Sequence, residues 1–123
     1  MEKHQDRRLS LGQGGEDAAV AYLEKNHYRI LARGFRFLHG EIDIIARQGE
    51  TIVFIEVKTR SGAGFGSPEE AVTASKQKRI RRMAEGFLMK FRIGPDVPCR
   101  FDVLSISVGK DDVPEIRHVK DAF

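Results

Sequence analysis

The sequence predicts an α/β domain with the element order αβββαβ, in which a mixed sheet is flanked by helices. Two stretches carry apolar residues at helical spacing, and between them the spacing of apolar residues changes to two. The second helix separates a run of strands with short turns from a later strand, which can therefore join the sheet in parallel. A chain of 123 residues is long enough for one domain with a single core.

The first helix is predicted from about Gly14 to Lys25. Ahead of it, residues 1–10 are polar and aperiodic, so we expect a flexible tail before a domain that spans residues 11–123. Four apolar residues recur at helical spacing within this helix and define its buried side. They are Ala18, Ala19, Tyr22 and Leu23.

Three strands are predicted next, over residues 28–38, 41–47 and 51–59. These segments are rich in β-branched and aromatic residues, and much of their length alternates with a period of two. Short turns around Gly40 and Gly49 separate them, which indicates an antiparallel meander.

The long helix is predicted from Ser67 to Phe91. The segment Ser67-Pro68-Glu69-Glu70 has serine at the N-cap, proline at N1 and glutamate at N3, which is a capping box. Gly94-Pro95 is expected to stop the helix. Its apolar stripe consists of Ile80, Met83, Ala84, Phe87, Leu88 and Phe91. Strands over residues 98–108 and 115–119 complete the predicted order.

The distribution of charge favours a polyanionic partner. The net charge is only +3, but the stretch from Lys76 to Arg92 holds seven basic residues and one acidic residue. Such a local excess is typical of nucleic-acid binding, although a solvated helix face is the alternative interpretation. The candidate nucleic-acid contacts are Lys76, Gln77, Lys78, Arg79 and Arg82.

Other features exclude several classes of protein. Cys99 is the single cysteine, so no intramolecular disulfide can form and a reducing compartment is expected. There is no apolar run of about 20 residues that could span a bilayer, and no signal peptide. We therefore expect a cytoplasmic protein without a membrane partner. The four histidines lack metal-ligand spacing and are expected at the surface.

The candidate chemistry lies on the second and third predicted strands. Residues two apart on a strand share a face, so Glu41, Asp43 and Ile45 should face away from Ile42 and its even-numbered neighbours. On the next strand, one face is apolar at its start and charged at its end. That face consists of Ile52, Phe54, Glu56 and Lys58.

A hairpin centred near Gly49 sets Asp43 opposite Glu56 or its immediate neighbour. Opposed strand residues have Cβ atoms about 4.5–5.5 Å apart, so the two carboxylates would repel each other without a cation between them. Carboxylate ligands favour Mg²⁺ or Mn²⁺. Lys58 would then orient an attacking water or stabilise charge at a phosphate. Taken alone, Glu56 and Lys58 are also typical of an exposed charge pair.

The complete pattern resembles the PD-(D/E)xK nuclease superfamily, which includes restriction-endonuclease-like and Holliday-junction-resolvase-like folds. More narrowly, it is similar to the YraN family of uncharacterised bacterial proteins, and the similarity covers nearly the whole chain after residue 10. The motifs that carry it are Gly15-Glu-Asp-Ala18, Gly40-Glu-Ile-Asp-Ile-Ile-Ala46, Phe54-Ile-Glu-Val-Lys-Thr-Arg60, Phe65-Gly-Ser-Pro68, Ser75-Lys-Gln77, Arg100-Phe-Asp-Val103 and Val119-Lys-Asp-Ala-Phe123.

This resemblance implies roles for four residues. Asp43 and Glu56 would bind Mg²⁺ or Mn²⁺, and Lys58 would be the catalytic lysine. Glu16 matches an acidic residue near the metal in related nucleases, which makes it a third candidate ligand and catalytic group. The chain departs from the family pattern at Gly34, where asparagine is expected, and Glu41 replaces the proline of the superfamily name.

Three functional hypotheses follow. The first is a metal-dependent endonuclease that hydrolyses phosphodiester bonds in branched, nicked or single-stranded DNA. The second is a non-catalytic nucleic-acid-binding module that keeps the nuclease fold. The third is an interaction subunit in which the apolar stripe ending at Phe87, Leu88 and Phe91 is partly exposed to a partner. A homodimer is one arrangement that a nuclease core of this size can adopt.

Overall fold

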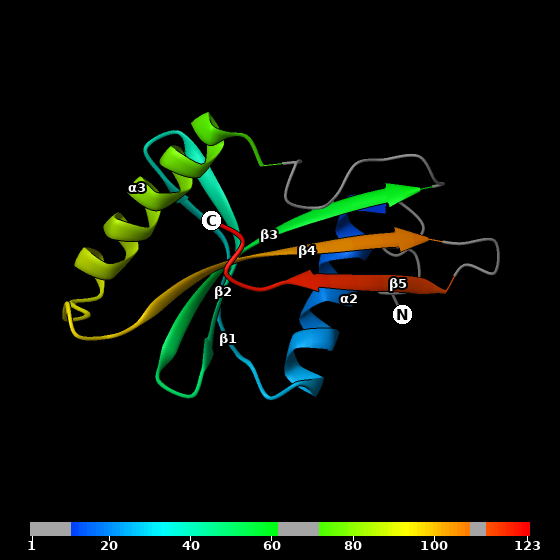
Figure 1. Cartoon of the computed structure of the whole chain (residues 1–123), viewed down its shortest axis with the longest axis horizontal. Coiled ribbons are helices and arrows are strands. Elements are labelled where there is room, and N and C mark those ends of the chain that lie inside the picture. The colour runs from blue at the N-terminus through cyan, green and yellow to red at the C-terminus, as the bar shows by residue number, and fades with distance from the viewer. Residues whose placement is uncertain (1–10, 62–71, 109–112) are drawn as a thin grey trace, which may run out of the picture.

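The computed structural model describes residues 11–61, 72–108 and 113–123. Within these residues, one five-stranded sheet carries a helix on each face, α2 (Leu11–Lys25) and α3 (Ala74–Lys90) (Figure 1). The strands are β1 (Arg29–Phe37), β2 (Gly40–Gln48), β3 (Thr51–Ser61), β4 (Cys99–Val108) and β5 (Pro114–Val119). The predicted α/β fold with a mixed sheet is therefore confirmed, and it is consistent with a restriction-endonuclease-like core. The predicted tail, residues 1–10, lies outside the described residues.

The strands follow the order β1-β2-β3-β4-β5 across the sheet. The first three form the predicted antiparallel meander, and β5 pairs antiparallel with β4. β3 and β4 are parallel from the Ile52–Cys99 pair to the Ser61–Val108 pair. A parallel connection needs a long crossover, and α3 lies within it, as the sequence predicted.

Two apolar cores lie on opposite faces of the sheet. Ile80, Met83 and Phe87 of α3 pack with Phe54 on one face, and Leu23 of α2 packs with a second set on the other. The central strand contributes to both cores because its successive side chains point to opposite faces. The second core consists of Ala19, Leu23, Tyr28, Ile44, Ala46, Val53, Ile55, Leu104 and Ile106.

The predicted alternation fails in β2. Ile42 packs in the same α3-side core as Ile45, although the two are three positions apart and strict alternation would set them on opposite faces. Their partners in β1, Phe35 and Ala32, are also three residues apart and pack against that core as well. Between these partners lies Gly34 with φ +65°, and both strands change facing across this point. Because asparagine and glycine both tolerate positive φ, the departure from the family pattern is compatible with this conformation.

α3 begins later than predicted. Val72 and Thr73 are not helical, and the Thr73 hydroxyl caps the helix by accepting a hydrogen bond from the Lys76 N–H at 3.3 Å. A continuous helix from Ser67 is therefore wrong. The capping box of residues 67–70 lies outside the described residues.

α3 ends within one residue of its predicted end, about Phe91. It stops at Lys90, and Arg92 takes φ +55°, while the Ile93 N–H donates to the Leu88 carbonyl at 2.9 Å. These contacts form a Schellman motif, which closes the helix before Gly94-Pro95 is reached.

Most of the predicted apolar stripe is buried against the sheet. Ile80, Met83, Ala84 and Phe87 are each at most 5% exposed, whereas Phe91, beyond the end of the helix, is 55% exposed. Burial of Phe87 removes much of the support for the interaction-subunit hypothesis, although Phe91 remains available. Within the described residues, neither helix is long and apolar enough to cross a bilayer.

Candidate metal centre

The candidate site lies where β2 and β3 stop pairing. Their ladder runs from Gln48–Thr51 to Ile44–Ile55 and ends there. The Asp43 carboxylate occupies the next position, with Oδ2 accepting a hydrogen bond from the Val57 N–H at 2.8 Å. Beyond this point the β1–β2 hairpin reaches toward α3, whereas β3 continues beside β4 (Figure 1). The hairpin centred near Gly49 thus brings Asp43 to the level of Glu56, as predicted.

Glu56 is a carboxylate buried on the α3 side of β3. Its side chain is only 7% exposed, and it follows the buried residues Ile52 and Phe54 on the same face. Oε2 lies 2.8 Å from Lys76 Nζ and 3.7 Å from Lys58 Nζ. Oε1 is buried and has no hydrogen-bond partner. Burying a carboxylate oxygen without a hydrogen-bond partner costs free energy, so this atom is a candidate ligand for a cation.

The pKa of Asp43 is raised to about 7, far above the ordinary value for aspartate. Burial is the largest cause, and the negative charge of Glu56 is the second. The charge of Glu16 adds to the increase, while the hydrogen bond from Val57 N–H opposes it. At neutral pH this carboxyl group is therefore close to half protonated, and a bound cation would displace the proton.

Two lysines supply positive charge to the pair, and their pKa values shift in opposite directions. The pKa of Lys58 is lowered, first by burial and then by its contact with Lys76. Burial also acts to lower the pKa of Lys76, but its hydrogen bonds with Glu56 and Lys58 outweigh burial and raise it. Positive charge is therefore held on Lys76, and Lys58 is the more readily deprotonated of the two.

Glu16 approaches the site from α2. A Cβ atom added at Gly15 would collide with Thr59 Oγ1, so glycine lets α2 lie directly against the end of β3. Glu16 follows, and its Oε1 lies 3.5 Å from Arg33 Nη2, which also binds Asp17 at 2.9 Å. The structure thus brings Asp43 and Glu56 together and holds Glu16 toward Arg33.

A divalent cation fits the donor set that these residues provide. Within residues 11–61, 72–108 and 113–123, no group of three or more His, Cys, Asp or Glu side chains could hold a metal by itself. Asp43 and Glu56 instead offer two carboxylates, one with an oxygen that lacks any partner. Mg²⁺ is commonly bound by one or two carboxylates, with water and phosphate oxygens as its other ligands. The pair therefore suits Mg²⁺ or Mn²⁺ better than it suits zinc.

The predicted nucleic-acid contacts on α3 divide into two groups. Lys76 is committed to Glu56, and Gln77 Nε2 donates to the Val72 carbonyl at 3.1 Å. Lys78, Arg79 and Arg82 are exposed. The ion pair between Lys76 and Glu56 could not be predicted from the sequence, because the distance between them depends on how α3 packs across the sheet.

A second buried polar cluster is structural. Asp102 is 0% exposed and binds Arg100 twice at 2.9 Å, His118 Nε2 at 2.7 Å and the Asp121 N–H at 2.9 Å. Burial alone would raise the pKa of Asp102, but these hydrogen bonds outweigh burial and lower it. Asp102 therefore has a structural role in this cluster. The surface role expected for histidines is wrong for His118, whose side chain is 6% exposed.

Comparison with known proteins places this chain in a family. Residues 15–106 match the family model described as "Uncharacterised protein family UPF0102". The chain belongs to UPF0102. A UPF0102 protein of Geobacter sulfurreducens is 50% identical over 92% of this chain and 88% of its own length. Relatives from Symbiobacterium thermophilum and Caldicellulosiruptor saccharolyticus are 47% and 46% identical and match over 95% and 98% of their lengths. The predicted YraN-family membership is thereby confirmed, while function is argued from the site.

Proposed function

We propose that this UPF0102 protein is a metal-dependent endonuclease that hydrolyses phosphodiester bonds in branched, nicked or single-stranded DNA. The observation that carries the proposal is the carboxylate pair Asp43 and Glu56, at the point where β2 and β3 stop pairing. Glu56 Oε1 is buried there without a hydrogen-bond partner, and the neighbouring Asp43 has a pKa of about 7. Two carboxylates beside two lysines supply both the ligands for a cation and the positive charge that phosphate chemistry needs.

Each residue has a defined task in this proposal. Asp43 and Glu56 would hold the ion, which supplies Lewis-acid stabilisation of the phosphate when bound. The lowered pKa of Lys58 lets its amine accept a proton from an attacking water or hold that water by a hydrogen bond. The Val57 N–H fixes the orientation of the Asp43 carboxylate at 2.8 Å. The exposed basic residues of α3 would attract the DNA backbone.

The test compares the purified wild type with Asp43→Asn and Lys58→Ala. Labelled duplex, single-stranded, nicked and four-way-junction DNA are incubated with Mg²⁺, Mn²⁺ or EDTA. Glu85→Gln is the matched control, because Glu85 is an exposed carboxylate on α3. We expect the wild type and Glu85→Gln to cut at least one substrate with metal, and both site variants to be at least 100-fold slower. Failure of the wild type to cut any DNA with either metal would overturn the proposal.

A non-catalytic nucleic-acid-binding module is the second candidate function. It is favoured by the ion pair between Lys76 and Glu56, because at 2.8 Å the lysine neutralises a carboxylate that a metal would otherwise need. On this hypothesis DNA binding is salt-sensitive, is unaffected by EDTA and survives Lys58→Ala without any cleavage. Loss of binding upon chelation would count against it.

A further inference from the structure

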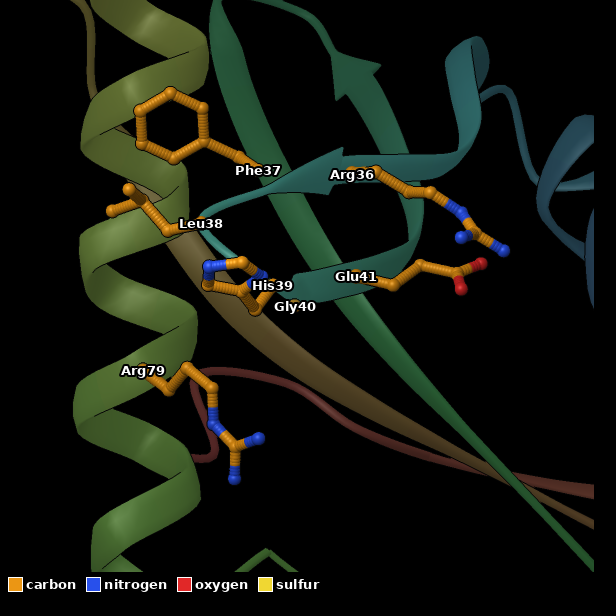
Figure 2. A pocket seen from close by; sticks show the side chains of 7 residues that line it. All are labelled: Arg36, Phe37, Leu38, His39, Gly40, Glu41 and Arg79. Atoms are coloured by element: carbon orange, nitrogen blue, oxygen red, sulfur yellow. The ribbon is translucent and has the colours of Figure 1, made fainter.

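A hollow lies between the tip of the β1–β2 hairpin and α3. Its volume is about 690 Å³, and Arg36, Leu38, His39, Glu41 and Arg79 line it (Figure 2). The hairpin is seated firmly on the helix. A Cβ atom added at Gly40 would lie 2.5 Å from Met83 Sδ, and one added at Gly86 would collide with the Phe37 ring. Nothing larger than glycine fits at either contact, so the position of the tip relative to α3 is fixed.

The tip itself is strained. Leu38 and His39 have φ values of +51° and +62°, in the left-handed region that asparagine and glycine usually occupy in two-residue hairpins. Leu38 is also 55% exposed, so burial of its side chain does not compensate for this conformation. Strained residues that persist at an exposed tip are typical of functional contacts.

Two arginines that line the hollow have no ion-pair partner among the described residues. The side chains of Arg36 and Arg79 make neither an ion pair nor a hydrogen bond there. Arg33 and Arg100, by contrast, are bound to carboxylates at 2.9 Å.

One carboxylate, that of Glu41, opposes these cations. It pairs across the strands with Arg36, and its Oε2 would lie 2.9 Å from a Cβ atom at Gly34. Figure 2 shows Arg36 and Glu41 extending together, with His39 and Arg79 on the other side of the turn. Arg79 therefore faces the hollow without an acidic neighbour from this hairpin.

The hollow is also adjacent to the carboxylate pair. Arg79 follows Lys76 by three residues on α3, which places them on one helix face with a rise of about 4.5 Å between them. Glu41 likewise precedes Asp43 by two residues on β2. Because a nucleic-acid strand carries one phosphate per nucleotide, a strand lying over the carboxylate pair would bring a neighbouring phosphate toward this hollow.

We propose that this hollow binds a backbone phosphate of the nucleic-acid strand that flanks the phosphate at Asp43 and Glu56. Arg79 contacts the phosphate oxygens from α3, Arg36 contacts the strand from the other side of the turn, and the exposed Leu38 packs against the adjoining sugar or base. An exposed apolar side chain beside a guanidinium group that has no ion-pair partner among the described residues suits a nucleotide better than an inorganic anion, which offers no apolar surface. The inference rests on the proposed function, because it requires a strand at the carboxylate pair.

The experiment measures binding of labelled single-stranded and nicked DNA by fluorescence anisotropy in EDTA, over a series of salt concentrations. The variants are Arg36→Ala, Arg79→Ala and the double variant. Arg29→Ala is the matched control, since Arg29 is an exposed arginine at the other end of β1. We expect each single variant to bind about 5- to 10-fold more weakly and the double variant to lose about 0.7–0.9 from the slope of log affinity against log salt. The control should match the wild type.

Leu38→Asn separates the binding role of the tip from its structural role. Asparagine relieves the strain at φ +51°, so the variant should melt at the same temperature as the wild type or higher. We nevertheless expect its DNA affinity to fall about threefold or more, because the apolar contact is lost.

The outcomes separate the two proposals. DNA binding by the wild type that Arg36→Ala, Arg79→Ala and Leu38→Asn leave unchanged would overturn this inference and leave the proposed function standing. Absence of DNA binding by the wild type would overturn both. Pyrophosphate is the probe for a free anion. If pyrophosphate at about 1 mM, the Kd scale of a weak site, bound to the wild type but not to Arg79→Ala and left the bound DNA in place, the hollow would be a site for small anions and the strand contact would be rejected.

Discussion

Lys76 Nζ lies 2.8 Å from Glu56 Oε2, and the other oxygen of the same carboxylate is buried without a partner. Glu56 Oε2 is thus paired with a lysine from α3, and Glu56 Oε1 is available to a second cation. A divalent cation bound to Glu56 would consequently compete with Lys76 for the charge of one carboxylate, and this relationship gives the first prediction.

Lys76→Ala should bind Mn²⁺ about tenfold more tightly than the wild type, because a competing positive charge beside Glu56 is removed. Without metal, the variant should be about 1–3 kcal/mol less stable, since Glu56 then loses its closest partner. Isothermal titration with Mn²⁺ measures the first effect, and urea unfolding in EDTA measures the second. Lys78→Ala, at an exposed position on the same helix, is the control. Weaker Mn²⁺ binding by Lys76→Ala would show that the lysine assists the metal.

Asp43→Asn should stabilise the metal-free protein at neutral pH. The folded chain has an Asp43 pKa of about 7, whereas the usual value is 3.8. Between these values the folded state binds more protons than the unfolded state, so the free energy of unfolding falls as pH rises through this window. Asparagine removes that loss and can still accept the Val57 hydrogen bond.

Thermal melts in EDTA from pH 4 to pH 8 check this expectation, within the roughly pH 4–7 window that the linkage relation sets. The melting temperature of Asp43→Asn should exceed that of the wild type by about 4 °C or more at the upper end, which corresponds to about 1 kcal/mol. The difference should vanish near the lower end. Saturating Mn²⁺ should stabilise the wild type and not the variant. A variant that is less stable at every pH would contradict the proposed repulsion.

His118→Phe should destabilise the fold by about 2–4 kcal/mol without changing Mn²⁺ affinity. The ionised Asp102 only accepts hydrogen bonds, so His118 Nε2 donates to it at 2.7 Å, and Nδ1 shares a hydrogen bond with the Tyr22 hydroxyl at 3.0 Å. Phenylalanine leaves both partners without this contact. Urea unfolding is the measurement, and His27→Asn is the control, because His27 is exposed and has φ +70°. A loss below about 0.5 kcal/mol would mean that Arg100 and the Asp121 N–H satisfy Asp102 without His118.

The same cluster has a defined pH dependence. The pKa of Asp102 is lowered, so its stabilising contribution is present above pH 3.8, the usual value, and is lost as pH falls below it. Asp102→Asn should be less stable than the wild type at neutral pH, and the gap should narrow on acidification. Urea midpoints at a series of acidic pH values measure it. A gap that widens on acidification would contradict the assigned hydrogen bonds.

Gly15→Ala should cost about 1–3 kcal/mol, because the added methyl group meets the Thr59 side chain and moves α2 away from β3. Thr59→Ala removes the Oγ1 and Cγ2 atoms that it would meet, so the double variant should be less destabilised than the sum of the two single changes. A double-mutant cycle by urea unfolding tests this coupling. Strictly additive losses would show that the close approach is not what requires glycine.

Local pattern determined much of the fold. The period-two alternation and the turn at Gly49 predict the β2–β3 hairpin and bring Asp43 to the level of Glu56, because hairpin register follows from the turn. The helix between the meander and β4 likewise predicts the parallel pairing of β3 and β4. The start of α3 was missed because two capping signals compete near its N-terminus, and Thr73 caps the described helix.

Tertiary structure alone decided the state of the site. Whether Lys76 meets Glu56 depends on the rotation of α3 over the sheet, and the facing of Ile42 depends on the change of direction at Gly34. The burial of His118 depends on the pairing of β5 with β4, which sets His118 beside Tyr22 of α2. The sequence by itself determined which residues are candidates for the chemistry, since residue type and strand period are local properties. Contacts between segments far apart in the chain decide which charged side chains are buried and which partners they bind. Local periodicity does not encode these contacts.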